Sequence, residues 1–495
     1  MLQKNLRILW LYPNQHMRVT PPGGIAIITA CLKRAGYHNI ELFDATWYPI
    51  DNDDVHHLVD RDNERIKRQM FPDYEWKRDD VEKDFFMLED TDMYTAWRQK
   101  VIDFKPDVVI SSIVEDTYYI WKRFIDKVSD QKFISVAGGV FCTYNPKAFE
   151  GQVDYICRGE GDEVIPELMD LISEGKTGHH LANVHPNPMR PALNVNTLPS
   201  TDHDIFDKRS LYRPFQGEII KIATVETQRG CPFKCKFCNS PSNAGIYKEE
   251  TDSLFFRKRS VEHQEEEIKH LLDTIEVEYL WIVTDTFLTM SKKEFDKWAT
   301  MYSKYKLPFF TQTRPELLSP YQAKTLKELG CIKLNMGVEH GDPKFRRDVI
   351  GRIYENTKAI EAFDIATEAG LSTTCNFIIG YPYETLENCW KSVELASQLN
   401  CSDINAFIYT PYHGTPMRDM CVDAGFISDD LIVEMINDDQ GSFLNMPRPY
   451  MNKKEIYDMY NNFGKYFREN TVQRDRIGEG KLRQELARKK TEDNK

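Results

Sequence analysis

Residues 219–241 read IIKIATVETQRGCPFKCKFCNSP, and the cysteines in this stretch, Cys231, Cys235 and Cys238, follow a C-x3-C-x2-C pattern. The β-rich run before them predicts a strand, so the cysteines are expected in the loop at its carboxyl end. Three thiolates at this spacing can hold three of the four irons of a cubane cluster, whereas a ferredoxin site needs a fourth cysteine nearby. The next cysteine along the chain is Cys331. The pattern therefore predicts an iron–sulfur cluster with one open iron, which can chelate a small molecule.

Zinc is the main alternative for clustered cysteines, because structural zinc sites use four cysteine or histidine ligands at short spacing. The first histidine after Cys238 is His263, which lies outside that spacing. The other cysteines are scattered singly along the chain, so they do not form a disulfide framework. An iron–sulfur redox sensor or a zinc-stabilised binding scaffold remains as a non-enzymatic alternative.

Strands and helices are expected to alternate from the cysteine motif onward. Six such β/α units make a partial barrel, whose active site lies at the carboxyl ends of the parallel strands. The expected strands are 219–227, 279–288, 309–318, 333–342, 376–385 and 404–417, and the expected helices include 260–274, 291–305 and 355–370.

The first 200 residues also alternate, with expected strands at 6–12, 39–45, 106–113 and 132–139 and a helix at 25–36. This order predicts a doubly wound α/β domain that binds a ligand at the carboxyl ends of its strands. Two strand ends are suggestive, because one carries small hydroxyl side chains and the next a glycine pair that lets a ligand approach the backbone. These residues are Ser111, Ser112, Gly138 and Gly139.

A helical insertion is expected at about 45–104, either as a solvated cap over the sheet or as a lid over the substrate. We divide the chain into a doubly wound domain at 1–200, a partial barrel at 215–420 and a helical region with a charged tail at 421–495. Within the last region, helices are expected in 423–438 and 446–470.

The composition describes an ordinary globular chain of 495 residues, with 41% hydrophobic residues. A net charge of -13 makes nucleic acid a poor partner. The longest apolar runs fall well short of the roughly 20 residues of a spanning helix, so no membrane span is expected. The first residues lack the pattern of a secretory signal, and we expect a cytoplasmic protein.

The motif and the strand endings together resemble the radical S-adenosylmethionine (SAM) enzymes, whose C-x3-C-x-aromatic-C motif is matched here with Phe237 at the aromatic position. The resemblance implies that Cys231, Cys235 and Cys238 hold a [4Fe-4S] cluster whose open iron binds SAM. One-electron reduction then cleaves SAM to a 5'-deoxyadenosyl radical. It also implies that Phe237 packs near the adenine.

The same resemblance assigns further SAM contacts at successive strand ends. These are Thr284 and Asp285 near the amino group, Gln312 and Arg314 after the third strand, Asn335 at the ribose hydroxyls with Glu339 just beyond, and Ile379 and Gly380 by the adenine. Each has a structural alternative. Asp285 can be a helix N-cap, Arg314 and Glu339 can form an ion pair, and Asn335 or Gln312 can satisfy backbone groups at strand ends.

The first half resembles the cobalamin-binding domain that one radical SAM subfamily carries before its barrel. It has a Pro-rich loop before a glycine-containing helix start, the serine and glycine strand ends, and an R-G-E-G run at 158–161. The resemblance implies that Ser111, Ser112, Gly138 and Gly139 cradle the nucleotide tail of cobalamin. The D-x-H-x-x-G motif of other cobalamin proteins is missing, since Asn14 stands two residues before His16. Either cobalt has no histidine ligand or the domain binds no cobalamin.

These expectations converge on a cobalamin-dependent radical SAM enzyme that methylates an unactivated carbon of a small-molecule or natural-product substrate. The alternative is a radical SAM oxidative cyclase or rearrangement enzyme that transfers no methyl group. The expected partners are the small-molecule substrate and an electron donor such as flavodoxin or ferredoxin. Beyond the three cysteines, the sequence assigns no catalytic residue.

Overall fold

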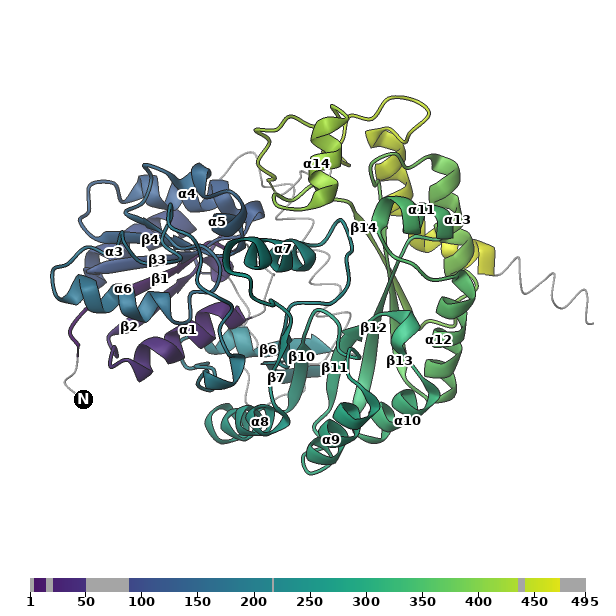
Figure 1. Cartoon of the computed structure of the whole chain (residues 1–495), viewed down its shortest axis with the longest axis horizontal. Helices are drawn as coiled ribbons and strands as arrows, with labels where there is room; N and C mark the ends of the chain where they lie inside the picture. The colour runs from purple at the N-terminus through teal and green to yellow at the C-terminus, as the bar shows by residue number, and fades with distance from the viewer. Residues whose placement is uncertain (1–3, 15–20, 50–88, 216–217, 435–440, 472–495) are drawn as a thin grey trace, which may run out of the picture.

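Two sheets lie side by side in the computed structural model, which describes residues 4–14, 21–49, 89–215, 218–434 and 441–471. The first sheet, in purple and blue, and the second, in green, each belong to an α/β layer structure (Figure 1). Expectations for His16, for residues 50–88 of the insertion and for the charged tail after residue 471 lie outside the described residues.

The first sheet has five parallel strands in the order β2-β1-β3-β4-β5. This confirms the doubly wound fold, with the switch point of strand order between β1 and β3. The strands are β1 (Ile8–Tyr12), β2 (Ile40–Asp44), β3 (Val108–Ser112), β4 (Ile134–Gly138) and β5 (Tyr155–Ile156).

Helices cover both faces of this sheet, and alternate residues of its strands therefore pack into two different hydrophobic cores. Ile8 and Trp10 pack with α1 (Gly23–Arg34) and α6 (Val164–Ser173). Leu9 and Leu11 pack with α3 (Met93–Phe104) and α4 (Tyr118–Lys127). The end of the expected helical insertion is therefore α3, which lies against the sheet.

The second sheet has seven strands in the order β14-β13-β12-β11-β10-β7-β6. The six strands from β7 to β14 are parallel and match the expected units, whereas β6 pairs antiparallel with β7 and was not expected from the sequence. The strands are β6 (Tyr212–Phe215), β7 (Glu218–Glu226), β10 (Tyr279–Val283), β11 (Phe309–Thr313), β12 (Cys331–Glu339), β13 (Ser372–Ile379) and β14 (Asp403–Ile408).

Helices cover the outer face of the second sheet and curve around it as a half-barrel (Figure 1). Ser291, Ser319 and Thr385 begin three of them with capping boxes, which satisfy free backbone N–H groups. The covering helices are α8 (Val261–Ile275), α9 (Lys292–Tyr302), α10 (Pro320–Glu328), α12 (Asn356–Glu368) and α13 (Leu386–Ala396). α7 (Asn239–Thr251) lies between the two sheets.

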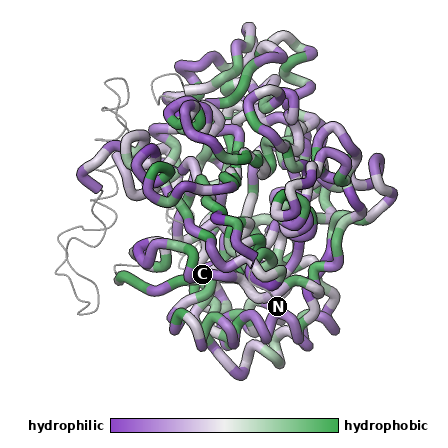
Figure 2. The backbone as a smooth tube through the Cα atoms, turned by 90° about the vertical axis from the view of Figure 1, so that its left-hand side faces the viewer, coloured by the Kyte–Doolittle hydropathy of each residue, from purple (hydrophilic) through white to green (hydrophobic). Residues whose placement is uncertain are grey.

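The C-terminal region is only partly helical. Helix α14 (Pro416–Asp423) ends where a helix over 423–438 was expected, and residues 424–434 contain no helix, so that expectation is wrong for the described part. The chain is helical at 453–471, where Ile456, Met459 and Phe463 pack into the barrel core. Hydrophobic and hydrophilic stretches alternate along the helical turns that face the viewer in Figure 2, as expected of helices with one buried face. None of the described helices has the length and apolar character needed to cross a membrane.

Candidate functional site

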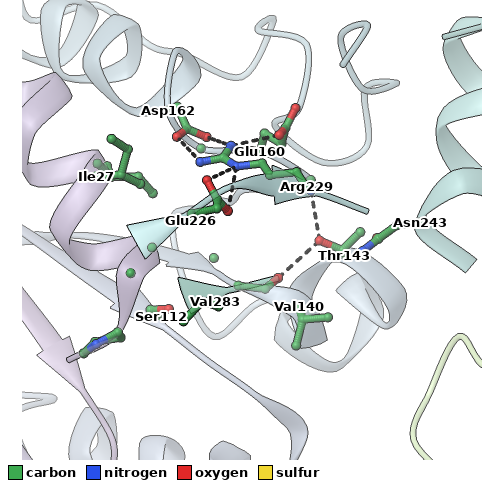
Figure 3. Close-up of a pocket in the computed structure, with 18 of the residues that line it drawn as sticks. Ile27, Ser112, Val140, Thr143, Glu160, Asp162, Glu226, Arg229, Asn243 and Val283 are labelled. Carbon is green, nitrogen blue, oxygen red and sulfur yellow. Dashed lines mark hydrogen bonds and ion pairs between the residues drawn. The ribbon is translucent and has the colours of Figure 1, made fainter. Parts of the chain in front are cut away.

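A cavity of about 990 Å³ lies between the carboxyl ends of the two sheets (Figure 3). The first sheet contributes the ends of β1, β3 and β4, and the second contributes the ends of β7, β10 and β11 together with the start of α7. Among the residues assigned from the sequence, nine line it: Ser111, Ser112, Gly138, Gly139, Phe237, Cys238, Thr284, Asp285 and Gln312. The topology thus brings residues of both halves of the chain to one space.

Glycines shape the first-sheet side of the cavity. Gly139 has φ +102°, and a Cβ there would lie 2.5 Å from the carbonyl oxygen of Ile113, so only glycine fits. Gly23 and Gly24 begin α1 and face open space, with no atom within 4 Å of a Cβ on either. That helix start has no side-chain cap, and backbone N–H groups at a helix start favour an anion.

A polar atom without a partner also faces this side. The indole Nε1 of Trp10 is buried and finds no hydrogen-bond partner among the described residues. An open glycine cradle, a helix start without a cap and a buried donor are features that fit a bulky, phosphate-bearing cofactor such as cobalamin.

The three cysteines of the motif have different surroundings. Cys231 Sγ lies 3.6 Å from Thr286 Oγ1, and both side chains are at least partly buried. Cys238 is the N-cap of α7, where its Sγ accepts from the backbone N–H of Ser240 at 3.5 Å. Cys235 is buried and 6% exposed. Cys231 and Cys238 thus have different hydrogen-bonding neighbours.

Burial raises the pKa of the Cys231 thiol, and it raises the pKa of Cys238 to about 12. Both thiols are consequently protonated at neutral pH in the free protein, and metal binding must displace their protons. Among the described residues, no three Cys, His, Asp or Glu side chains are gathered closely enough for a single metal ion. The three thiols nevertheless lie near enough to interact electrostatically with one another, as the ligands of one cluster must.

Two arginines contact Cys235: Arg314, which was predicted as a SAM contact, and Arg352, which was not predicted as a site residue. Arg314 NH1 lies 3.5 Å from Cys235 Sγ while its guanidinium stacks 3.7 Å from the ring centroid of Phe233. Arg352 Nε lies 3.3 Å from the same sulfur. Arg352 follows the glycine that ends a short helical turn, Arg346–Ile350, and no spacing relative to the cysteine motif marks it in the sequence. Two cations thus face a sulfur that becomes a thiolate when iron binds.

The expected SAM contacts on the cavity wall have mixed surroundings. Thr284 is 3% exposed, and its hydroxyl has no hydrogen-bond partner among the described residues. Asp285 accepts from Ser240 Oγ at 2.9 Å, and burial raises the pKa of its carboxyl. Gln312 Nε2 donates to the backbone oxygen of Thr284 at 2.6 Å, which is the backbone-satisfying role weighed above. Asp285 starts no helix, so the N-cap alternative is wrong.

The remaining expected SAM residues do not line the cavity: Arg314, Asn335, Glu339, Ile379 and Gly380. Arg314 pairs with Glu316, and Glu339 lies 3.4 Å from Arg352, so the alternative of a direct pair between Arg314 and Glu339 is wrong. The Gly380 N–H is held at 2.6 Å by the buried Glu384, which the sequence analysis missed.

A charged cluster closes one side of the cavity, and it too was missed (Figure 3). Arg229, two residues before the cysteine motif, donates to Glu160, Asp162 and Glu226 at 2.8–3.2 Å. Glu160 belongs to the R-G-E-G run, which was the available signal for this site.

Comparisons with known proteins agree with this architecture. Residues 225–396 match the family model described as the Radical SAM superfamily. An uncharacterized methyltransferase of Pyrococcus horikoshii is 27% identical over 64% of this chain and 70% of its own length. The anaerobic magnesium-protoporphyrin IX monomethyl ester cyclase of Rubrivivax gelatinosus is 22% identical over 85% of this chain and 70% of its own length.

A solved structure extends the likeness across both sheets. The radical SAM methyltransferase TsrM from Kitasatospora setae, determined with cobalamin and a [4Fe-4S] cluster bound, is 16% identical. It covers 92% of this chain, with 84% of its own chain matched and a TM-score of 0.58. At this identity the match establishes the shared fold, from the first sheet through the half-barrel.

Proposed function

From the match of residues 225–396 to the radical SAM superfamily, we propose that this chain is a cobalamin-dependent radical SAM enzyme that methylates an unactivated carbon of a small-molecule substrate. One observation carries the proposal. A single cavity joins the serine and glycine strand ends of the first sheet to the cysteine loop and strand ends of the second. A methyl group carried on one side and a radical generated on the other can act on the same carbon only if both sides open into one space.

The proposed cofactors supply the difficult chemistry: the cluster provides the electron that cleaves SAM to a 5'-deoxyadenosyl radical, and cobalamin provides the methyl group. Cys231, Cys235 and Cys238 are the proposed iron ligands. Ser111, Ser112, Gly138 and Gly139 are the proposed cobalamin cradle.

The protein's own groups orient SAM in this proposal. The Asp285 carboxylate, fixed by the Ser240 hydroxyl, accepts from the SAM amino group, and the unpartnered Thr284 hydroxyl lies beside it. Phe237 offers an apolar face to the adenine from the cavity wall. Arg314 and Arg352 hold Cys235 in place and offset the negative charge that its thiolate brings.

A second reaction class is supported by a specific observation. The cyclase from Rubrivivax gelatinosus aligns with more of this chain than the Pyrococcus methyltransferase does. Radical-driven cyclisation or rearrangement uses the same hydrogen abstraction from substrate but leaves the methyl group in place. The two reactions therefore differ in whether S-adenosylhomocysteine accumulates as a product.

The proposal is tested by anaerobic purification and reconstitution, with iron, sulfide and corrinoid measured per chain. SAM is then added under reducing conditions, and 5'-deoxyadenosine and S-adenosylhomocysteine are quantified. We expect four irons, one corrinoid and both nucleosides. 5'-Deoxyadenosine with corrinoid but without S-adenosylhomocysteine would favour cyclisation, and a protein that takes up no corrinoid would overturn cobalamin dependence.

The matched variant is Cys235→Ala. Loss of one of three iron ligands is expected to lower the iron content and to reduce 5'-deoxyadenosine formation by at least 100-fold. Cys331→Ala, in which a buried cysteine far along the chain is changed, serves as the control and is expected to keep the cluster. A Cys235→Ala protein with full SAM cleavage would contradict the assignment of the cluster.

A further inference from the structure

Arg229 lies where the two halves of the molecule meet in the cavity. It precedes Cys231 by two residues on the barrel side, in the short strand β8 (Gln228–Arg229). Two of its three carboxylate partners, Glu160 and Asp162, come from the first half of the chain, just after β5. The third, Glu226, ends β7 of the barrel. One guanidinium therefore joins both halves directly beside the cysteine loop (Figure 3).

Four of the five N–H groups of the guanidinium donate to these partners. Nε donates to Glu226, NH1 donates to Glu160 at 2.8 Å and to Asp162 at 2.9 Å, and NH2 donates to Asp162 at 2.9 Å. The Asp162 pair is bidentate, the geometry that fixes orientation as well as distance. Asp162 is 4% exposed and Glu160 12%, whereas the Glu226 side chain is 33% exposed. An arginine held in this way by three carboxylates has little capacity to bind a substrate anion and instead acts as a rigid link.

Two of the three carboxylates are shared with further arginines. Arg257 donates to Glu160 at 2.8 and 2.9 Å, and Arg259 donates to Glu226 at 3.0 Å. Three arginines thus contact three carboxylates in this cluster. A fourth carboxylate, that of Glu267, lies 3.8 Å from Arg259. Removing Arg229 leaves Asp162 without its cation in a buried position, whereas Glu160 and Glu226 keep theirs.

A short chain of contacts continues from this link to the glycine pair of the first sheet. Glu160 follows Gly159, whose N–H donates to Thr143 Oγ1 at 2.9 Å. The same hydroxyl donates to the carbonyl oxygen of Gly139 at 3.2 Å. The path from the cysteine loop to Gly139 therefore runs through Arg229, Glu160, Gly159 and the Thr143 hydroxyl. Figure 3 shows Arg229, Glu160 and Thr143 of this path.

We propose that Arg229 is a positioning residue that holds the cobalamin-binding loops of the first half in register with the cluster loop of the barrel. The inference rests on the proposed function, since it concerns how two cofactors are held relative to each other. Its consequence is separable from cluster chemistry. Cleavage of SAM needs only the barrel, whereas transfer of the SAM methyl group to cobalamin needs both halves at a fixed separation.

A second contact between the halves makes the test interpretable. Glu115, after β3, accepts from the backbone N–H and Nδ1 of His413 at 2.8 and 2.7 Å and from the Val433 N–H at 2.8 Å. This contact lies beyond β14, away from Arg229, and it remains when Arg229 is changed. The halves are therefore expected to stay attached in the variant but to lose their fixed position relative to each other beside the cavity.

The experiment compares Arg229→Gln with Arg158→Gln in the full chain. Arg158 also joins the halves, through Glu250 of α7 at 2.6 Å, but it does not line the cavity. In the apoprotein, hydrogen exchange of the amides at 139–143 and 159–162 is expected to accelerate at least tenfold in Arg229→Gln. In Arg158→Gln, amides 139–143 are expected to stay within twofold of the wild-type rates. Equal exchange at 139–143 in wild type and Arg229→Gln would overturn the proposal without reference to any cofactor.

The reconstituted enzyme gives the second readout. Arg229→Gln is expected to keep its iron and corrinoid and its 5'-deoxyadenosine formation within twofold, while S-adenosylhomocysteine formation falls at least tenfold. A parallel loss of both nucleosides would make Arg229 merely structural and would overturn the proposal. If Arg229→Gln fails to fold, Asp162→Asn tests the same link from the other half and is expected to shift the same ratio. Wild-type protein without corrinoid would instead overturn the proposed function and leave the exchange result standing as the test of the link.

Discussion

The two sheets are built from parallel strands, yet they differ in what covers them. The first sheet is buried on both faces, and four of the five residues in β1 and in β3 are buried. The second sheet is covered on its outer face only, and along β12 buried residues alternate with half-exposed ones. In β14 every second residue is exposed, and Phe407 is 51% exposed. The first sheet can therefore offer a ligand only its edge, whereas the second offers an edge and an inner face.

The inner face of the second sheet carries polar side chains. Lys333 of β12 donates to Asp403 of β14 at 2.6 Å, and Asn405 donates to Asn376 at 3.2 Å. These positions share one face because β13 and β14 pair in register, Asn376 opposite Asn405 and Ile378 opposite Phe407. A surface of amides, charges and one exposed ring on this inner face suits a substrate with hydrogen-bonding groups, in line with the proposed small-molecule substrate.

The largest expected effect compares two phenylalanines on neighbouring strands of the second sheet, one on its outer face and one on its inner face. Phe377 of β13 is fully buried on the outer face, 5.5 Å from the Phe463 ring, and Phe377→Ala is expected to cost about 4 kcal/mol of the free energy of unfolding. Phe407→Ala on the inner face is expected to change it by about 0.5 kcal/mol or less. Urea unfolding of both variants measures the difference. Equal losses would mean that the inner face is packed in solution.

A second test concerns the edge of the first sheet. Gly139→Ala places a Cβ 2.5 Å from the Ile113 oxygen at φ +102°, and we expect a loss of about 3 kcal/mol together with weaker corrinoid uptake. Gly151→Ala is the matched control, because it has φ +73° but no atom within 4 Å of its Cβ. It is expected to lose about 1 kcal/mol and to keep its corrinoid. Equal corrinoid content in the two variants would argue against Gly139 as part of the cradle.

The same contrast explains what the sequence could predict. A sheet buried on both faces gives continuous apolar runs, such as LRILWLY, and a half-covered sheet gives alternation, as in KLNMGVE, so both could be recognised. The strand-end residues of the first sheet followed from topology, because parallel strands end at one edge, whereas those of the barrel were assigned from the resemblance to radical SAM enzymes. The antiparallel strand β6 was missed because it is four residues long and has no helix after it.

Contacts between residues that are far apart in the sequence could not be predicted in the same way. Arg352 reaches Cys235 from 117 positions away, and Arg229 reaches Asp162 from 67 positions away. Local patterns predict which residues share a strand or a helix, but they do not predict which distant charges meet. Several assigned SAM contacts lie off the cavity for the same reason, since Glu339 turns toward Arg352 and Gly380 is held by Glu384.

Asp285 provides a pH test of the barrel side of the cavity. Burial raises the pKa of this carboxyl, so it takes up a proton at a higher pH than an exposed aspartate. Because the SAM amino group needs the ionised carboxylate, SAM affinity is expected to fall as the pH is lowered through that raised pKa. The stability of the apoprotein is expected to change in the opposite direction. It rises as the pH is lowered through the raised pKa, because protonation neutralises a buried carboxylate. Asp285→Asn is expected to weaken SAM binding about tenfold and to abolish this pH dependence, as measured by equilibrium dialysis. An unchanged pH profile would place the amino group elsewhere.

The smallest expected effect concerns how an electron reaches the cysteine loop. Lys234 is exposed between two of the cysteines, on a chain whose net charge of -13 otherwise repels acidic proteins. An acidic donor such as flavodoxin is therefore expected to approach here, and Lys234→Glu is expected to slow cluster reduction by flavodoxin about threefold at low salt. The difference should shrink as salt screens the charges.

Reduction by dithionite, which is small and needs no docking surface, is expected to be unchanged. Lys324→Glu, on an exposed position of α10, is the control and should match the wild type with both reductants. If both variants slow reduction equally, the net charge of the chain rather than a local surface governs the encounter with the donor.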